Sequence, residues 1–247
     1  MLRLSLINQS GQVTLTSVLL QSLQQQLRAN PDVHCIVIEG DADAFCEGLD
    51  LNTFTAISDD KERKSAFVEF KVLLDTLAAS PAIVIAAVRG KVLGGGLGFL
   101  GVADCVIAEP DVTFSLPETM LGIIPAVILP HITRRMGIAR AQLLALGYQA
   151  LSAEQALAYG LIDEVSTSLC KRLNKQIQRF LRMDAKAVAT MKQLINVHAA
   201  TPLWHEHYFQ DAIDKAIELA SSPQVKKRVE LLQQGFAPWS SEVVVES

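Results

Sequence analysis

Up to about residue 165, short apolar segments alternate along this chain with segments of helical periodicity. Residues 34–39, 82–88 and 105–108 are apolar and predict strands, whereas residues 61–79 repeat their apolar side chains at helical spacing. Beyond residue 165 the pattern is helical throughout. Strands that alternate with helices predict an α/β fold, built on a mainly parallel sheet with helical crossovers.

Capping signals indicate where two of the helices begin. Thr14 or Thr16 is expected to cap a helix that runs to about residue 29. Ser152, followed three residues later by Gln155, has the spacing of a capping box, which predicts a short helix directly after it. A brief strand is expected next, at residues 161–162.

Composition excludes several classes of function. The chain of 247 residues is 50% hydrophobic, which is enough for a large core, and its net charge of −4 supplies no positive field for nucleic acid. The first residues lack the apolar core of a signal peptide, and no apolar run reaches the ~18 residues that cross a membrane. The four cysteines are scattered without C-x-x-C spacing. We therefore expect a cytoplasmic protein with no metal site, no nucleic-acid partner and no membrane partner.

The glycine-rich stretch 94–101, GGGLGFLG, contains a literal G-x-G-x-x-G when it is read from Gly96. A dinucleotide-binding fold needs a full crossover helix after these glycines, but only a few residues separate Gly101 from the strand expected at 105–108. Two interpretations remain. The glycines permit close packing of a helix on the sheet, or they leave bare backbone N–H groups beside a cleft, where these hold a developing negative oxygen.

Three motifs in order resemble those of the enoyl-CoA hydratase/isomerase family, the crotonases. They are DAFCEGLDL at 43–51, GKVLGGGLGFLGVADCVIAEPDVTFSLPE at 90–118, and LGYQALSAEQALAYGLIDEV at 146–165. The resemblance implies a ClpP/crotonase-like spiral of β-β-α units over residues 1–165, which carries the active site. It also implies a helical region at 166–247 that builds homotrimers, in many members paired into hexamers.

The resemblance also implies a chemistry and a set of site residues. Family members act on acyl thioesters of coenzyme A or of acyl carrier protein, with no cofactor beyond the phosphopantetheine that carries the substrate. Backbone N–H groups of Leu49 and Gly95 would form the oxyanion hole, and Glu118 would be the catalytic acid and base. The remaining substrate-binding candidates are Asp50, Leu51, Gly94, Gly96, Gly98, Pro117, Ile123 and His131. His131, Arg134 or Arg135 could bind a substrate carboxylate, although His131 could equally be an interface or surface histidine.

Three departures from the family pattern narrow the reaction. Hydratases with two catalytic carboxylates carry one of them where this chain has Gly98, so Glu118 stands alone. The segment 122–137, GIIPAVILPHITRRMG, is similar to the subgroup that dehydrates 3-hydroxy-3-methylglutaryl on acyl carrier protein in polyketide β-branching. Cations that bind the coenzyme A nucleotide are missing at 8–10 and 233–235, which favours a carrier protein, although the basic run 226–228 remains a candidate for a phosphate contact.

The sequence therefore predicts a lyase that removes water from a 3-hydroxyacyl thioester. One alternative is a Δ3,Δ2-enoyl-CoA isomerase or an enoyl-CoA hydratase of fatty-acid metabolism, because a 1,3-proton shift needs one carboxylate only. An alternative of another class is a non-catalytic subunit that assembles with an active relative.

Overall fold

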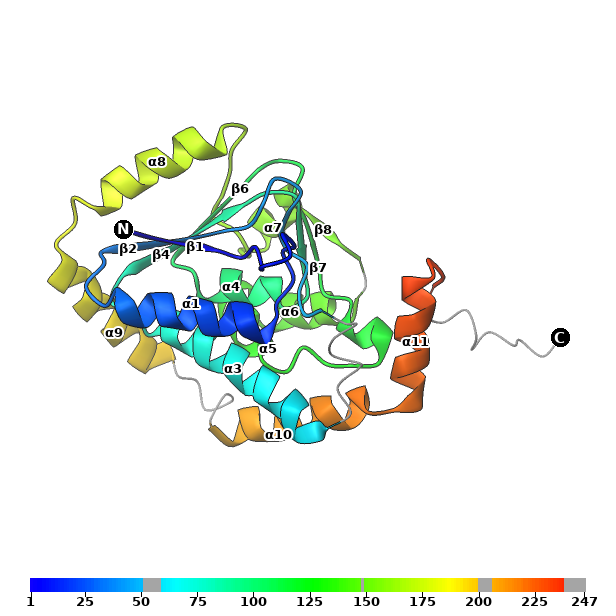
Figure 1. Cartoon of the computed structure of the whole chain (residues 1–247). Helices are drawn as coiled ribbons and strands as arrows, with labels where there is room; N and C mark the ends of the chain where they lie inside the picture. The colour runs from blue at the N-terminus through cyan, green and yellow to red at the C-terminus, as the bar shows by residue number, and fades with distance from the viewer. Residues whose placement is uncertain (51–58, 148, 200–205, 238–247) are drawn as a thin grey trace.

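The computed structural model describes residues 1–50, 59–147, 149–199 and 206–237 of the chain (Figure 1). Its centre is a parallel sheet in the strand order β1-β2-β4-β6-β9. The strands are β1 (Leu2–Ser5), β2 (Cys35–Glu39), β4 (Ile83–Val88), β6 (Cys105–Ala108) and β9 (Glu164–Val165). The strands expected near 34–39, 82–88 and 105–108 are thus confirmed.

The strand expected at 161–162 is wrong, because pairing with β6 begins only at Glu164. The N–H groups of Leu161 and Ile162 instead bond back to the carbonyl of Ala156, at 2.9 and 3.4 Å, and so close the preceding helix. Both side chains are buried. Their apolar character therefore reflects packing under that helix, which a two-residue sequence pattern does not distinguish from a strand.

A second, smaller sheet has the order β3-β5-β7-β8 and is parallel except for the last pair. Its strands are β3 (Ala44–Cys46), β5 (Lys91–Leu93), β7 (Thr113–Ser115) and β8 (Leu151–Ser152). From β2, from β4 and from β6 the chain passes directly into this second sheet. This repeat is the β-β-α spiral that the resemblance implies, so the α/β crotonase fold is confirmed.

Helices cover both faces of the main sheet, which explains why its central strands are continuously apolar. All residues of β4 are buried. On one face lies α8 (Leu169–Phe180), whose Leu173 and Ile177 pack against Ile85 and its neighbours. On the other face lie α1 (Ser17–Ala29), α3 (Asp60–Ala78) and α4 (Gly96–Val102), as Figure 1 shows.

The capping predictions are confirmed. Thr16 is the N-cap of α1, and its side chain accepts a hydrogen bond from the Leu19 N–H at 3.2 Å. Ser152 and Gln155 form both bonds of the capping box, at 3.2 and 3.0 Å, and open α7 (Ala153–Ala158). These contacts are local, so short sequence patterns are enough to predict them.

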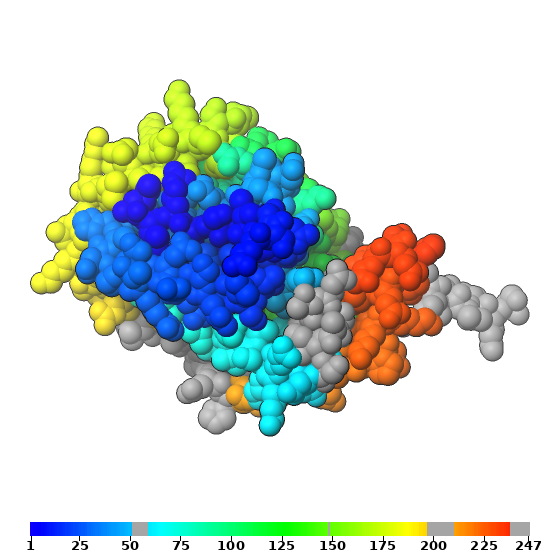
Figure 2. All heavy atoms as spheres, viewed as in Figure 1, coloured from blue at the N-terminus to red at the C-terminus, as the bar shows by residue number. Residues whose placement is uncertain are grey.

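The rest of the chain is helical in its described parts. After β7 come η1 (Glu118–Leu121), α5 (Leu129–Met136) and α6 (Ile138–Ala145), and after α8 come α9 (Ala185–Ala199), α10 (Glu206–Ala220) and α11 (Pro223–Gln233). In the space-filling view α11, orange to red, projects from one side of the molecule (Figure 2). α11 contacts η1, so the end of the chain lies beside the residues that follow β7. Among the described helices, none is long and apolar enough to cross a bilayer.

Candidate active site

A cavity of about 170 Å³ lies where the loops after β3, β5 and β7 meet α3 and α11. Its wall is mostly apolar, with Glu47 and Glu118 as the charged side chains among the described lining residues. The lining residues are Glu47, Gly48, Leu49, Phe67, Phe70, Leu93, Gly94, Gly95, Pro117, Glu118, Leu121, Ile123, Ile124, Pro125, Ala126, Val127, Ile128 and Leu232. A mostly apolar pocket with a few convergent polar groups is typical of a binding or catalytic site.

Glu118 is one of the charged side chains that line this cavity. It begins η1 directly after Pro117, and its carboxyl group lies against Gly94, where an added Cβ would be 2.9 Å from Oε1. The residue is partly exposed, but Oε2 is buried and has no hydrogen-bond partner in the described part of the chain. Burial raises the pKa of Glu118 to about 7. A carboxyl group with such a pKa can both take and return a proton near neutral pH.

The residues Leu49 and Gly95, whose backbone N–H groups were expected to form the oxyanion hole, both line this cavity. Leu49 pairs with Leu15 in an isolated parallel bridge, in which Leu15 bonds to the Gly48 carbonyl at 2.8 Å and to the Asp50 N–H at 3.4 Å. In a parallel bridge of this kind, the N–H of Leu49 itself points away from Leu15. The N–H of Gly95 lies one residue before α4. Within the residues described, neither N–H donates a hydrogen bond.

Close backbone contact brings these two donors together. A Cβ added at Gly48 would lie 3.2 Å from the Gly95 nitrogen and 3.1 Å from the Leu93 carbonyl oxygen. Gly48 has a φ of +81°, which favours glycine. The Gly94 N–H also bonds to the Ser115 carbonyl at 3.0 Å, which ties the glycine turn to the strand that leads to Glu118. Two N–H groups and one carboxyl group therefore border one small cavity.

A sequence model of the family described as enoyl-CoA hydratase/isomerase matches residues 10–234. The chain belongs to this family. Because the match includes β2 to α11, both the cavity and the helices around it lie within the matched region.

Relatives within the enoyl-CoA hydratase/isomerase family include two with informative names. Bacillaene synthase dehydratase PksH of Bacillus subtilis (strain 168) is 33% identical over 165 residues, which span 66% of this chain and 64% of PksH. Mevalonyl-coenzyme A hydratase SIDH of Beauveria bassiana (strain ARSEF 2860) is 33% identical over 147 residues, 56% of this chain and 52% of SIDH.

Solved structures agree with the fold. A polyketide biosynthesis enoyl-CoA hydratase (pksH) from Bacillus subtilis has a TM-score of 0.78 at 28% identity, over 90% of this chain and 89% of that one. An enoyl-CoA hydratase from Mycobacterium avium paratuberculosis K-10 has a TM-score of 0.85 at 23% identity, over 97% and 94% of the two chains. The latter likeness concerns the fold alone.

The expected glycines divide into two groups. Gly94 and Gly95 line the cavity, whereas Gly96 and Gly98 do not. A Cβ at Gly96 would lie 2.9 Å from the Cβ of Cys46, and one at Gly98 would lie 2.7 Å from Ile128 Cγ2. Close packing thus accounts for Gly96 and Gly98. Apolar groups of Ile128, Leu74 and Phe70 fill the space around Gly98.

The other expected substrate-binding residues are distributed differently. Pro117 and Ile123 line the cavity. Asp50 follows Leu49 in the chain and is not part of the lining, and Leu51 lies outside the described residues. Cys46 is buried behind the glycine turn, and burial raises the pKa of its thiol to about 12, which is typical of a packing residue.

His131 lies on α5 and does not line the cavity. Its Cβ packs against Gly101 of α4, where an added Cβ would be only 2.6 Å away. Burial lowers the pKa of His131 to about 4, and its Nε2 is buried with no partner among the described residues. The ring is therefore neutral near pH 7, and its surroundings resemble those of a core histidine.

The two arginines that follow on α5 are bound to neighbouring elements. Arg134 donates to Asn196 Oδ1 at 3.0 Å. Arg135 donates to the carbonyls of Leu161 and Ala103, at 2.6 and 3.0 Å, and pairs with Asp163. Neither lines the cavity.

Several lining residues escaped the sequence analysis. Phe67 and Phe70 of α3 form one wall, and Leu232 of α11 borders the cavity from the far end of the chain. Helical spacing predicts that α3 has a buried face, but it does not indicate that part of this face borders a cleft. Glu47 also lines the cavity, and its position within the first family motif was the sequence signal that could have predicted this.

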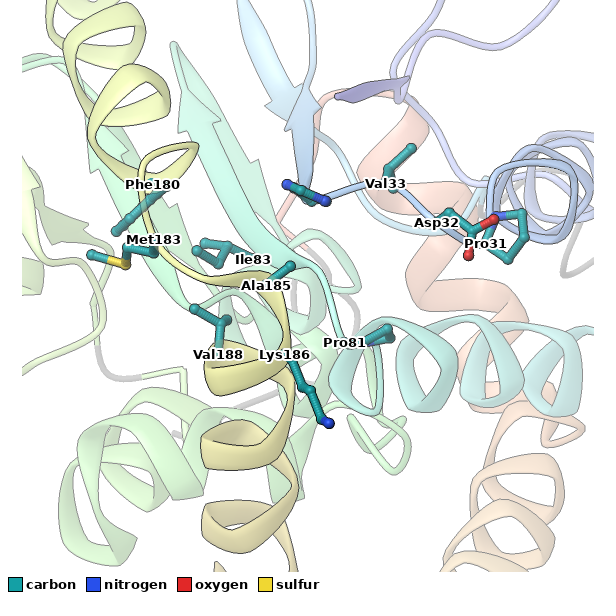
Figure 3. A pocket seen from close by; sticks show the side chains of 11 residues that line it. Pro31, Asp32, Val33, Pro81, Ile83, Phe180, Met183, Ala185, Lys186 and Val188 are labelled. Atoms are coloured by element: carbon teal, nitrogen blue, oxygen red, sulfur yellow. The ribbon is translucent and has the colours of Figure 1, made fainter.

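A larger hollow of about 330 Å³ lies away from this site, between the starts of β2 and β4 and the turn from α8 to α9 (Figure 3). Phe180, Met183, Ile83 and Val188 form its apolar side, and Asp32 stands opposite, as Figure 3 shows. We assign the candidate active site to the smaller cavity, because only there do the described residues bring unpartnered N–H groups and a perturbed carboxyl group together. No group of three or more metal-ligating side chains occurs in the described part of the chain.

Proposed function

We propose that this protein is a lyase that eliminates water from a 3-hydroxyacyl thioester. The observation that carries the proposal is the Glu118 carboxyl group, which is buried, has a pKa near 7 and lies beside the Leu49 and Gly95 N–H groups. This arrangement combines a proton carrier with two donors for a developing negative oxygen.

The reaction begins at the thioester carbonyl. Its oxygen accepts hydrogen bonds from the N–H groups of Leu49 and Gly95, which stabilise the enolate that forms when C2 loses a proton. Fixed backbone donors need no reorganisation during the reaction, and removal of one such donor typically costs about 3–4 kcal/mol. The glycines at 94 and 95 keep side chains away from the approaching carbonyl.

Glu118 moves the proton. As a carboxylate it takes the proton from C2, and the protonated carboxyl group then gives it to the hydroxyl group that leaves C3. The C3–O bond breaks, the C2–C3 double bond forms, and water is released. One carboxyl group serves both steps when the elimination is syn, so the absence of a carboxylate at Gly98 is no obstacle.

For the substrate we propose a short, branched acyl group, 3-hydroxy-3-methylglutaryl on acyl carrier protein, as in polyketide β-branching. The cavity of about 170 Å³ is smaller than the roughly 300–1,000 Å³ of pockets for drug-sized ligands, which favours a short acyl chain. Two relatives support this choice by name: PksH is a bacillaene synthase dehydratase, and SIDH is a mevalonyl-coenzyme A hydratase. Missing cations at 8–10 and 233–235 favour a carrier protein over coenzyme A.

The test is the Glu118→Gln protein, assayed with 3-hydroxy-3-methylglutaryl loaded on carrier protein. Mass spectrometry should detect the loss of one water with the wild type and a loss of turnover of about 10²- to 10⁴-fold with the variant. Glu154→Gln, an exposed substitution on α7, is the matched control. Wild-type rates in Glu118→Gln would overturn the assignment.

Isomerisation of a Δ3-enoyl thioester is the second candidate, because the described cavity holds one buried carboxyl group and the space around Gly98 is apolar. Incorporation of solvent deuterium into a Δ3-enoyl thioester, without water exchange at C3, would favour it. A non-catalytic assembly role would be favoured if neither thioester changed.

We also propose that copies of the chain assemble into a homotrimer, and pairs of trimers into a hexamer, through the face around α9. Met191, Leu194 and Ile195 are 52, 58 and 54% exposed there, and the hollow of Figure 3 adjoins the start of this helix. A contiguous exposed apolar surface of this kind is typical of an association face.

A further inference from the structure

The Glu118 carboxyl group depends on its backbone for its position in the cavity. Oε2 is buried without a hydrogen-bond partner among the described residues, so no neighbouring side chain there fixes it. The carboxyl group therefore goes where its carrier goes, and this carrier is the single turn η1. Because a displacement of about 1 Å can lower a rate about 100-fold, the contacts that fix η1 also control the reaction.

Local backbone bonds close η1 but do not fasten it to the rest of the molecule. The Met120 N–H donates to the Pro117 carbonyl at 3.0 Å. The Ile123 N–H donates to the Glu118 carbonyl, also at 3.0 Å. Both bonds join residues that are close in the sequence, so they determine the shape of the turn and not its place beside the cavity.

Thr119 connects the turn to a helix that is remote in the sequence. Its Oγ1 donates a hydrogen bond to the Ala145 carbonyl at 2.8 Å. Ala145 is the last residue of α6, and the last carbonyls of a helix have no N–H partner within that helix. The hydroxyl group thus satisfies a carbonyl at the end of α6, and it does so from the residue that directly follows Glu118.

The chain after α6 supports the same turn. A Cβ added at Gly147 would lie 3.1 Å from Cγ of Met120 and 3.6 Å from Oγ1 of Thr119. Gly147 has a φ of +67°, which favours glycine. The end of α6 and the residues after it therefore pack against the two residues that follow Glu118.

We propose that Thr119 is a positioning residue for Glu118, whose carboxyl group it holds at the cavity through the hydrogen bond to the Ala145 carbonyl. This inference rests on the proposed dehydration and adds to it a residue that does not itself line the cavity. Because Thr119 acts through Glu118 and not through the substrate, the chemical step should depend on it while substrate binding should not.

The test is the Thr119→Val protein, which keeps the shape of the side chain and removes the donor. With 3-hydroxy-3-methylglutaryl carrier protein, kcat should fall roughly 10- to 100-fold while KM changes less than about twofold. Thr119→Ser restores the donor and should retain most of the wild-type kcat. Thr76→Val is the matched control, because the exposed Thr76 donates to the Val72 carbonyl at 2.7 Å within α3 and should lose no activity.

A second measurement does not require turnover. Burial raises the pKa of Glu118 to about 7, so NMR should detect a labelled carboxyl carbon that titrates there and that is missing in Glu118→Gln. In Thr119→Val this pKa should fall towards 4.5, because a displaced turn exposes Oε2 to water. Thr119→Ser and Thr76→Val should keep the wild-type titration.

Wild-type kcat in Thr119→Val, or equal losses in Thr119→Val and Thr119→Ser, would overturn the inference. A rise in KM with kcat unchanged would overturn it as well, since it would indicate a role in binding. If Thr119→Val does not fold, Thr119→Ala removes the same donor without placing a methyl group against the Ala145 carbonyl, and the same results are expected. If the wild type dehydrates nothing, the proposed function fails, while the titration of Glu118 still decides the role of Thr119.

Discussion

The active-site cavity and the region around α9 differ in whether their buried polar groups have hydrogen-bond partners. In the cavity, Glu118 Oε2 is buried without a partner among the described residues. On α9, the buried Lys192 has partners: its Nζ donates to the Ala82 carbonyl at 2.6 Å and pairs with Asp104. An unsatisfied buried polar group costs about 1–3 kcal/mol. The unpartnered oxygen in the cavity therefore lowers stability, whereas the contacts of Lys192 stabilise the packing of α9 against the residues around β4.

The two regions also differ in size and surface. The hollow of Figure 3 is the larger, and α9 contributes Ala185, Lys186 and Val188 to its lining. Volume alone would therefore select the wrong place for the chemistry. The decisive property is the presence of polar groups that a substrate, and not the protein, would satisfy.

The largest expected effect is that of Glu118 on the pH dependence of the free energy of unfolding. The pKa of Glu118 is raised from 4.5 to about 7, so between these values the folded protein holds a proton that the unfolded chain releases. The free energy of unfolding should therefore fall as pH rises from 4.5 to 7, by up to about 3 kcal/mol, relative to Glu118→Gln. Urea unfolding of both proteins from pH 4.5 to 8 measures the difference.

His131 acts with the opposite sign. Its pKa is lowered from 6.5 to about 4, so its contribution to stability is lost as pH falls through this range. Because His131 is present in both proteins, the difference between wild type and Glu118→Gln isolates Glu118. Parallel stability curves would contradict the raised pKa.

The next effect concerns the glycine that faces Glu118. In Gly94→Ala the new Cβ would lie 2.9 Å from Oε1 of Glu118, at a φ of +50°. Displacement of the carboxyl group should lower kcat about 100-fold, while backbone strain should lower the free energy of unfolding by about 1 kcal/mol. Steady-state kinetics and urea unfolding separate the two.

Gly11→Ala is the matched control for this variant. Gly11 has a φ of +78°, and an added Cβ would meet nothing within 4 Å. This substitution should reproduce the loss of stability but keep the activity. If both variants lose activity alike, the contact with Glu118 is not the cause.

A smaller effect on stability is expected at Asp104, the partner of Lys192 on α9. Asp104 Oδ2 accepts hydrogen bonds from the Val84 N–H at 2.8 Å and from Lys192. Asp104→Ala should therefore lower the free energy of unfolding by about 2 kcal/mol, with the kcat of the folded protein unchanged. Urea unfolding is the measurement, and Asp111→Ala, at an exposed position, is the control. A loss of activity without a loss of stability would break the contrast between the two regions.

The smallest effect on protomer stability is expected at the exposed face of α9. Ile195→Glu should change the free energy of unfolding by less than about 0.5 kcal/mol, but shift sedimentation towards smaller species. Val18→Glu is the control, because Val18 and Ile195 are both 54% exposed. An unchanged sedimentation profile for Ile195→Glu would remove this face from the proposed assembly.

Much of the fold was accessible from the sequence because its signals are local. The apolar run that forms β4, the N-cap at Thr16 and the capping box at Ser152 depend on neighbouring residues, so the pattern alone predicts them. The strands β3, β5 and β7 escaped prediction because three residues are too few to show a period. They pair with segments far along the chain, and only this pairing makes them strands.

The sequence predicted part of the candidate site. Glu118, Leu49 and Gly95 were expected from motifs, and the structure places all three at one cavity. His131 and Gly98 were expected in the same place, but they pack against neighbouring helices instead. Helical position does not by itself indicate which side chain faces a cavity, because this depends on how two helices cross.

By itself, the sequence determined the alternation of strands and helices, the family motifs and the candidate carboxyl group, Glu118. Only the tertiary structure decided that Oε2 of this carboxyl group is buried without a partner among the described residues. It also decided that Leu49 and Gly95, whose N–H groups donate to no described residue, line the same cavity, and that Leu232 of α11 borders it. The reason is physical: a pKa, an orientation of an N–H group and the approach of a distant helix depend on surroundings assembled from remote parts of the chain.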